Sequence, residues 1–286
     1  MRSVIRSTRS GFSLVELLIA LTITAVIGVA MTGLFVTQSR FLEIQQQREA
    51  ARSVTRSAMN IMMSEMRMID PDSGVVSAMD TAIVIRVPFA MGISCASTAT
   101  LLTFELLPID SVMYAQGVAA ISAGSGGFAY RQTDDKYKYI STTNAPAAGT
   151  ATTCTAAPTS ITQVTGGTFK QITTTAAYPV SRGQPIMLYQ NIRYHFNTST
   201  TVTGRRALFR TQAGTDEEIA APFDSTAKFN YYVNDSKTPT STVPSNLKTL
   251  TGFDLILNGV SEKPNANGTY SKVPMRTAVF FKNRRS

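Results

Sequence analysis

The fold of this chain is decided by the stretch RSGFSLVE at residues 9–16 and by the run LLIALTITAVIGVAMTGLFV at residues 17–36. The leader, residues 1–11, holds three arginines (Arg2, Arg6 and Arg9) and no acidic residue. The run carries no charge and is about 20 residues long, which is enough for a helix to cross a bilayer. One glutamate, Glu16, stands directly before it. The sequence therefore predicts a membrane helix that begins beside a carboxylate.

Charge around the run predicts its topology. Because basic residues favour the cytoplasmic side, we expect the N-terminus in the cytoplasm and the rest of the chain exported. An ordinary cleaved signal peptide has an apolar core of only about 7–15 residues, so this longer run does not favour one. A plain anchor has no use for Glu16, whose carboxylate costs a few kcal/mol at the membrane unless it is paired.

The order of Gly11, Phe12 and Glu16 between a basic leader and an apolar run resembles the processing site of type IV prepilins and pseudopilins. The resemblance implies that the inner-membrane prepilin peptidase and methyltransferase cuts after Gly11 and methylates Phe12. It also implies that Glu16, then the fifth residue, pairs with the N-terminal amine of a neighbouring subunit. The partners implied are other pilin or pseudopilin subunits, the peptidase and the inner membrane.

A second helical pattern follows the membrane run. Apolar residues recur at helical spacing without glycine or proline until Pro71, which predicts one helix from Phe12 to Ile69, roughly 85–90 Å long. Methionines at this spacing are expected to fill core rather than to bind metal. The buried face is expected to hold Ala51, Val54, Ala58, Ile61 and Met62. The predicted organisation is a leader at 1–11, a membrane helix half at 12–36, an amphipathic periplasmic half at 37–70 and a β-rich head at 71–286.

The head reads as short strands and turns, so we expect an α+β fold, with the long helix on an antiparallel sheet and no second domain. The Gly-, Ala-, Thr- and Ser-rich section at 119–179 predicts loops or edge hairpins, and Ala123–Gly127 predicts a flexible turn. The strands are expected at Ala82–Val87, Thr100–Leu106, Ile186–Tyr189, Ile192–Phe196, Ala207–Arg210, Ala227–Val233, Leu247–Leu257 and Met275–Lys282.

Two weaker motifs and one departure favour a subfamily. MMSEMRM at 62–68 and RTAVFFKN at 276–283 are similar to the corresponding segments of PilW-like minor pilins and of J-type minor pseudopilins of type II secretion. Major pilins commonly carry a helix-breaking proline where this chain has Gly33. The resemblance therefore implies a minor type IV pilin, with a J-type pseudopilin or a tip-displayed module that binds DNA or a surface as alternatives.

Two cysteines, Cys95 and Cys154, both follow the membrane run. In an exported head they predict one disulfide, which would close a loop of roughly 60 residues and contribute about 3–4 kcal/mol. Two separately buried thiols are the alternative. No histidine or further cysteine stands at metal-ligand spacing near either of them.

The sequence offers little for catalysis, so we expect neither an enzyme nor a cofactor. The single histidine, His195, lies in an alternating strand and predicts an ordinary sheet residue. The pairs Asp70/Asp72 and Asp134/Asp135 lack the ligand series of a calcium loop. Basic residues of the head are candidates for weak DNA contact, namely Arg205-Arg206, Arg284-Arg285 and the alternating segment Lys136–Tyr139.

Overall fold

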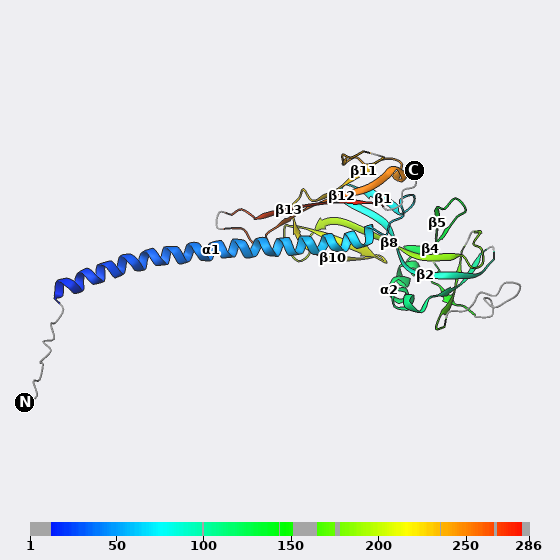
Figure 1. The fold of residues 1–286 in the computed structure, drawn as a ribbon, viewed down its shortest axis with the longest axis horizontal. Coiled ribbons are helices and arrows are strands. Elements are labelled where there is room, and N and C mark those ends of the chain that lie inside the picture. The colour runs from blue at the N-terminus through cyan, green and yellow to red at the C-terminus, as the bar shows by residue number, and fades with distance from the viewer. Residues whose placement is uncertain are drawn as a thin grey trace, which may run out of the picture.

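The long helix and the β-rich head are both present in the computed structural model, which describes residues 13–98, 100–142, 144–150, 165–174, 178–234, 236–265 and 268–281. Helix α1 (Leu14–Met66) extends well beyond the head at its N-terminal end (Figure 1). Its second half packs on an antiparallel sheet, so the expected α+β fold is confirmed. The helix ends three residues before the predicted Ile69. The Asp70 carboxylate accepts from the Ser73 N–H (3.0 Å) in the turn that follows.

Within the described residues, thirteen strands form the sheet. Three short helical elements also occur in the head, namely η1 (Pro108–Asp110), α2 (Ser111–Ser122) and η2 (Leu247–Thr249). The strands are β1 (Val75–Met79), β2 (Ala82–Ser97), β3 (Leu101–Leu106), β4 (Gly126–Arg131), β5 (Tyr137–Ser141), β6 (Ala147–Ala148), β7 (Thr168–Thr173), β8 (Pro185–Thr198), β9 (Arg206–Gln212), β10 (Thr215–Phe223), β11 (Lys228–Val233), β12 (Leu250–Val260) and β13 (Lys272–Phe280).

Two long strands organise the sheet. The hydrogen-bonded order is β11-β12-β10-β9-β8-β2-β3-β7-β6, with β1 on β2, β13 on β12, and β4 between β8 and β5. Strands β2 and β8 pair from Ala82 opposite His195 to Ile93 opposite Pro185, with a register shift between Pro88 and Ala90. Because proline has no N–H to donate to the neighbouring strand, it is tolerated where the pairing is irregular.

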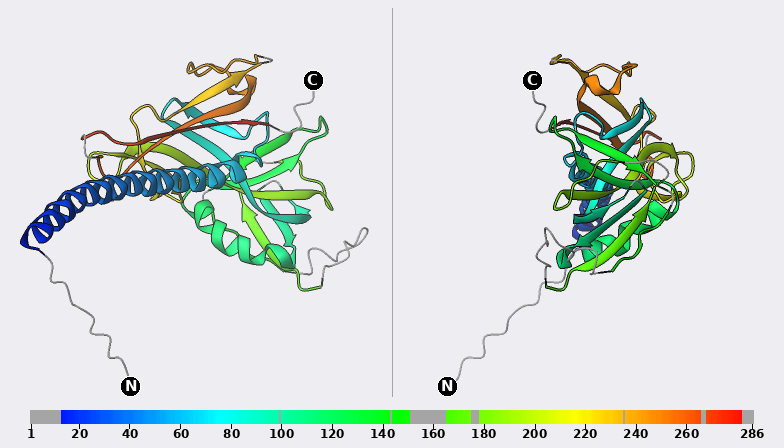
Figure 2. Two further views of the ribbon diagram at one scale, coloured as in Figure 1. Left: turned by 60° about the vertical axis from the view of Figure 1, so that its left-hand side comes forward. Right: turned by 90° about the vertical axis from the view of Figure 1, so that its right-hand side faces the viewer.

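The sheet encloses two hydrophobic cores, and β2 and β8 run through both. We call the part that packs on α1 the helix-side lobe, because its core joins α1 to β9, β10, β11, β12 and β13. The distal lobe is built on α2, β3, β4 and β7 and has its own core around Phe104, Phe128 and Leu188. Figures 1 and 2 show the distal lobe beyond the C-terminal end of α1.

The section at 119–179 was predicted incorrectly in part. Helix α2 was missed, and it packs so closely that a Cβ built on Gly117 would lie 2.4 Å from the Phe89 ring. Gly126 and Gly127 are not a flexible turn, since they begin β4 and are buried between β8 and β5. Only Gly124 has the left-handed φ (72°) of a turn, directly after α2. The hairpin of β4 and β5 agrees with the prediction.

Smaller differences concern strand boundaries. The two strands predicted around Asn191 are one strand, β8, because nothing between them breaks the ladder. Strand β12 begins at Leu250, after the turn η2, and extends to Val260. Its Phe253, Leu255 and Leu257 face the core. Asp254 on the opposite face is also buried, because Arg276 donates to both of its carboxylate oxygens (2.6 and 2.9 Å).

Candidate assembly site

The start of α1 is fixed by a reciprocal pair of hydrogen bonds. Ser13 is the N-cap: its Oγ accepts from the Glu16 N–H (3.2 Å), and the Glu16 carboxylate accepts from the Ser13 N–H (3.0 Å). This is a capping box, which satisfies two helix N–H groups that otherwise have no partner. The predicted processing residues Gly11 and Phe12 lie outside the described residues. The spacing Ser13-x-x-Glu16 was visible in the sequence as a capping signal.

Glu16 is the only charged residue between Ser13 and Val36, and it is exposed. A carboxylate beside the N-terminus of a helix is favoured by the helix dipole. In a bilayer this carboxylate still requires a cationic partner, because a charge near hydrocarbon is costly unless it is paired. The described part of the chain holds no cation near it, since the next charged residue along α1 is Arg40.

The first half of α1 presents apolar surface all around. Its most apolar window has a mean hydropathy of 2.4, and none of that window is buried against the rest of the chain. The threonine hydroxyls there donate to carbonyls three or four residues earlier, for example Thr24 to Ala20 (2.7 Å) and Thr32 to Gly28 (2.8 Å). These bonds let the hydroxyls enter hydrocarbon with a partner. The segment therefore has the length and chemistry of a membrane span.

No break interrupts this span. Gly28 and Gly33 are both helical, and no side chain or neighbouring element lies within 4 Å of a Cβ built on either. Glycine lowers helix stability but lacks the ring that makes proline break a helix. The helix consequently continues without interruption from the span into the head.

The second half of α1 is held on the sheet by one face. Ala51, Thr55 and Ala58 are buried, together with Met59, Met62 and Met66. The prediction was wrong for Ile61, which is partly exposed, and it missed Thr55. Gly259 of β12 allows the close approach at Thr55: a Cβ there would lie 2.3 Å from Thr55 Oγ1.

A polar contact fixes the C-terminal end of the helix. Glu65 accepts from Arg210 of β9 (Nη2–Oε1, 2.7 Å) and from the Tyr194 hydroxyl of β8 (2.7 Å). Burial and the neighbouring Glu65 carboxylate raise the pKa of Tyr194 far above its usual value, so its hydroxyl remains a neutral donor. Arg210 also donates to Gln212, which donates to Gln190. No pattern in the sequence links these residues.

Of the two cysteines, the structure describes Cys95 alone. It is fully buried at the distal end of β2 and is not a free thiol. Its expected partner Cys154 lies outside the described residues. The pairing of Cys95 with Cys154 therefore stays a prediction.

His195 is a buried sheet residue, as predicted. Its ring stacks on Phe209 (centroids 5.4 Å apart), and Nε2 lies 3.6 Å from the exposed Asp216. Burial, followed by the nearby Arg193, lowers the pKa of His195, so the imidazole is neutral near pH 7. Among the described residues, no serine–histidine or cysteine–histidine hydrogen bond is present.

The two acidic pairs come together in space, although they are distant in sequence. Asp70, Asp72, Asp134 and Asp135 line one pocket beside basic residues, among which Arg131 pairs with Asp135 (3.0 Å). Burial, together with Asp72, raises the pKa of Asp70. Within the described ranges, no three acidic, histidine or cysteine side chains converge as a metal site.

Two of the residues considered for DNA contact have aromatic partners within the chain, and Arg284-Arg285 lie outside the described residues. The Tyr139 ring lies edge-on against Tyr189 and carries the Arg86 guanidinium 4.8 Å from its centroid. Arg205 lies over the Tyr270 ring, 3.5 Å from its centroid. Neither tyrosine presents an unoccupied aromatic platform of the kind that stacks on bases.

Comparison with known proteins agrees with the geometry of the N-terminal segment. Residues 6–32 match the family described as the prokaryotic N-terminal methylation motif. Comparison with the curated proteins and with the solved structures gave no match. The matched residues contain the capping box, Glu16 and most of the apolar span, the features that the structure leaves exposed at the free end of α1.

The motif and the fold support the same class of protein. The motif is the signature of chains that prepilin peptidase processes. The fold is pilin-like, because a long helix with an apolar first half packs its second half on an antiparallel sheet. The chain is a membrane-anchored subunit with the components expected for assembly with other such subunits. The N-terminal methylation motif and the arrangement of helix and sheet thus agree with a type IV pilin or pseudopilin.

Proposed function

We propose that this chain is a minor type IV pilin, PilW-like, that joins a filament at its tip or in the complex that starts it. Prepilin peptidase cuts after Gly11 and methylates Phe12. The subunit then waits in the inner membrane with its N-terminus in the cytoplasm and its head in the periplasm. Its role is structural, and its work is assembly rather than catalysis.

The location of the distal lobe is the observation that supports a position at the filament tip. In a filament built on a bundle of these helices, the next subunits lie further along the helix axis. The distal lobe extends past the C-terminal end of α1 in that direction (Figure 1). A shaft subunit with such a lobe would meet the head above it, whereas a terminal subunit has free space there.

The exposed groups at the N-terminal end of α1 support assembly through this helix. The span offers apolar surface, and among the described residues the Glu16 carboxylate contacts only its own helix start. In the filament, neighbouring helices cover the apolar surface and a methylated amine of another subunit pairs with Glu16. The ion pair becomes stronger away from water, since a low dielectric strengthens Coulomb attraction.

A J-type pseudopilin that caps a secretion filament is the closest alternative, because a terminal position suits it equally well. The two proposals differ in the machine that is lost on deletion: pili for a minor pilin, and protein secretion for a pseudopilin. A DNA-binding module receives less support, because Tyr139 already packs against Tyr189 and Arg86.

Two measurements test this proposal: the intact mass of the mature chain and the position of its head in the filament. The intact mass should correspond to a chain that begins at N-methylated Phe12, and antibody labelling should find the head at filament ends. A mature chain with another N-terminus would reject the processing step. Labelling evenly along filaments would reject the tip position while leaving the processing step intact.

A further inference from the structure

One end of the head faces the membrane span. Gly259, near the end of β12, lies against Ala51 and Thr55 of α1, and the following Lys263 lines a groove with Glu43. We call residues 261–265 and 268–271, which join β12 to β13, the membrane-side turn. Val36 and Glu43 are about 10 Å apart along the helix. The headgroup layer is roughly 5–8 Å thick, so the turn reaches close to it.

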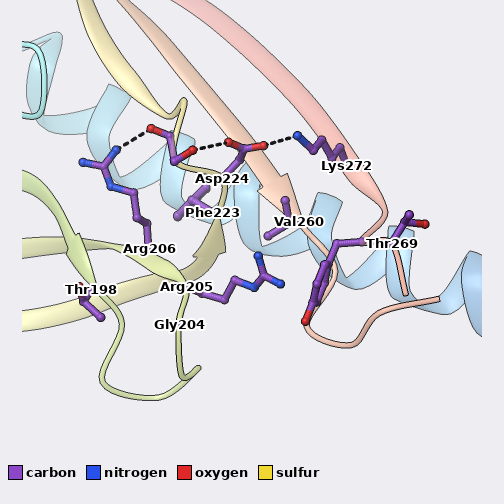
Figure 3. A pocket seen from close by; sticks show the side chains of 11 residues that line it. Thr198, Gly204, Arg205, Arg206, Phe223, Asp224, Val260, Thr269 and Lys272 are labelled. Carbon is purple, nitrogen blue, oxygen red and sulfur yellow. Dashed lines mark hydrogen bonds and ion pairs between the residues drawn. The ribbon is translucent and has the colours of Figure 1, made fainter. Parts of the chain in front are cut away.

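A pocket of about 610 Å³ opens beside this turn. Figure 3 shows Arg205, Arg206 and Lys272 around it, with Val260 at its apolar floor. The hydroxyls of Thr198 and Thr269 also line it. The Arg205 guanidinium is held flat over the Tyr270 ring of the turn, 3.5 Å from the centroid. Stacking of this kind orients the guanidinium before any ligand arrives.

Basic side chains outnumber acidic side chains in the lining of the pocket. Asp224 pairs with Lys272 (2.6 Å), so the carboxylate and this ammonium neutralise each other. Arg206 donates to the Ser225 carbonyl (2.8 Å), and Arg205 stacks on Tyr270. Neither arginine forms an ion pair within the part of the chain that the structure describes. The pocket is therefore a cationic site with two uncompensated guanidinium groups.

We propose that this pocket binds the phosphate of an anionic phospholipid headgroup while the subunit waits in the bilayer. A guanidinium fork fits two phosphate oxygens, and tyrosine is favoured at the membrane–water interface. Membrane helices tilt by about 20° on average, and a tilt toward the head lowers the pocket to the headgroups. The contact holds the head on the membrane in one orientation and is released when the subunit is drawn into the filament.

This inference rests on the proposed function, because it requires the head and the span to be on one anchored chain. The test uses the full processed chain in nanodiscs of phosphatidylcholine, with and without phosphatidylglycerol. The measurement is amide hydrogen exchange at residues 198–206 and 268–273. With phosphatidylglycerol we expect exchange there to slow about fivefold, the effect of one basic group at an anionic surface.

Three substitutions distinguish binding in the pocket from an effect of the overall charge of the head. Arg205→Glu should abolish the lipid-dependent slowing, and Arg205→Lys should retain part of it, because it keeps the charge but loses the fork. Lys237→Glu makes the same charge change after β11, which ends beside the start of β12, whereas the pocket lies at the other end of β12, and it should leave the slowing intact. All three variants keep α1, so they should enter nanodiscs normally. Failure to enter would count against the anchoring, not against the pocket.

Three results would overturn the proposal. The first is equal exchange with and without phosphatidylglycerol. The second is persistence of the slowing in Arg205→Glu. The third is slowing by inorganic phosphate in phosphatidylcholine nanodiscs without any slowing by phosphatidylglycerol, which would make the pocket a site for free anions.

Discussion

Glu65 of α1 and Arg210 of β9 are 145 residues apart in the chain, yet Nε and Nη2 of the arginine both donate to Oε1 of the glutamate, at 3.2 and 2.7 Å. Their side chains are only 16% and 14% exposed. The pair lies where α1 ends and the distal lobe begins. It ties the assembly helix to the middle of the sheet, so the direction of the helix and the position of the head are set together.

Removal of Glu65 should therefore loosen the helix from the head. In Glu65→Ala the Arg210 guanidinium stays largely buried without its partner, which should cost roughly 3 kcal/mol of unfolding free energy. Denaturant unfolding of the full chain in detergent, followed by near-ultraviolet circular dichroism, measures this cost. The double variant Glu65→Met/Arg210→Met buries no unpaired charge and should lose much less. Equal losses in the single and double variants would show that the pair is not the cause.

The proposed role of the Glu16 charge in filament assembly can be separated from its role in the capping box. Glu16→Gln keeps a side chain that can accept from the Ser13 N–H but removes the charge, so the helix should form while filament incorporation fails. Ser13→Ala keeps the charge and removes half of the box, which should cost about 1 kcal/mol at the helix start and leave incorporation intact. Sheared-filament and membrane fractions measure the outcome. Normal incorporation of Glu16→Gln would exclude charge pairing.

Acid should weaken the connection between β8 and β9. Burial alone would raise the pKa of Glu218, but hydrogen bonds from Thr200, Thr201 and Ser199 lower it to about 2. A lowered pKa means that the stabilisation is present above the unfolded value near 4.5 and is lost as pH falls toward 2. Melting temperatures between pH 5 and 2 should fall more steeply in the wild type than in Glu218→Gln. Parallel curves would remove Glu218 from the acid response.

The close contact between α1 and β12 should require glycine, which has no Cβ, at position 259. A Cβ there would lie 2.3 Å from Thr55 Oγ1 and 3.2 Å from the Ala51 carbonyl oxygen. Thr55 is buried and bonded to that carbonyl (2.7 Å), so it cannot yield easily. Gly259→Ala should destabilise the head by about 1–3 kcal/mol. Gly33→Ala, where a Cβ meets nothing within 4 Å, is the matched control and should leave unfolding of the head unchanged.

The predicted disulfide can be tested by counting thiols. Denatured but unreduced protein should take up no alkylating reagent, and reduction should release two reactive thiols. Cys95→Ser should lower the unfolding free energy by about 3–4 kcal/mol, because the loop is no longer closed in the unfolded chain. Alkylation of Cys95 and Cys154 before reduction would show that they are separate thiols.

Sequence prediction succeeded where neighbours in the chain carry the information. The apolar run, the spacing of Gly11, Phe12 and Glu16 and the short strand segments of the head are local patterns, and they indicated the processing motif and the α+β class. It failed at β4, whose Gly126 and Gly127 look like a loop in isolation. They become a strand because β8 and β5 bury them from both sides.

The sequence by itself determined how this protein is anchored: a leader, a span and a carboxylate at the start of α1 follow from charge and hydropathy alone. Only the tertiary structure decided how the head is shaped and which surfaces it presents. The pairing of β2 with β8 builds two lobes instead of one, and the approach of Tyr270 to Arg205 builds the cationic pocket. Each contact joins segments far apart in the chain, and burial between distant segments leaves no local pattern to read.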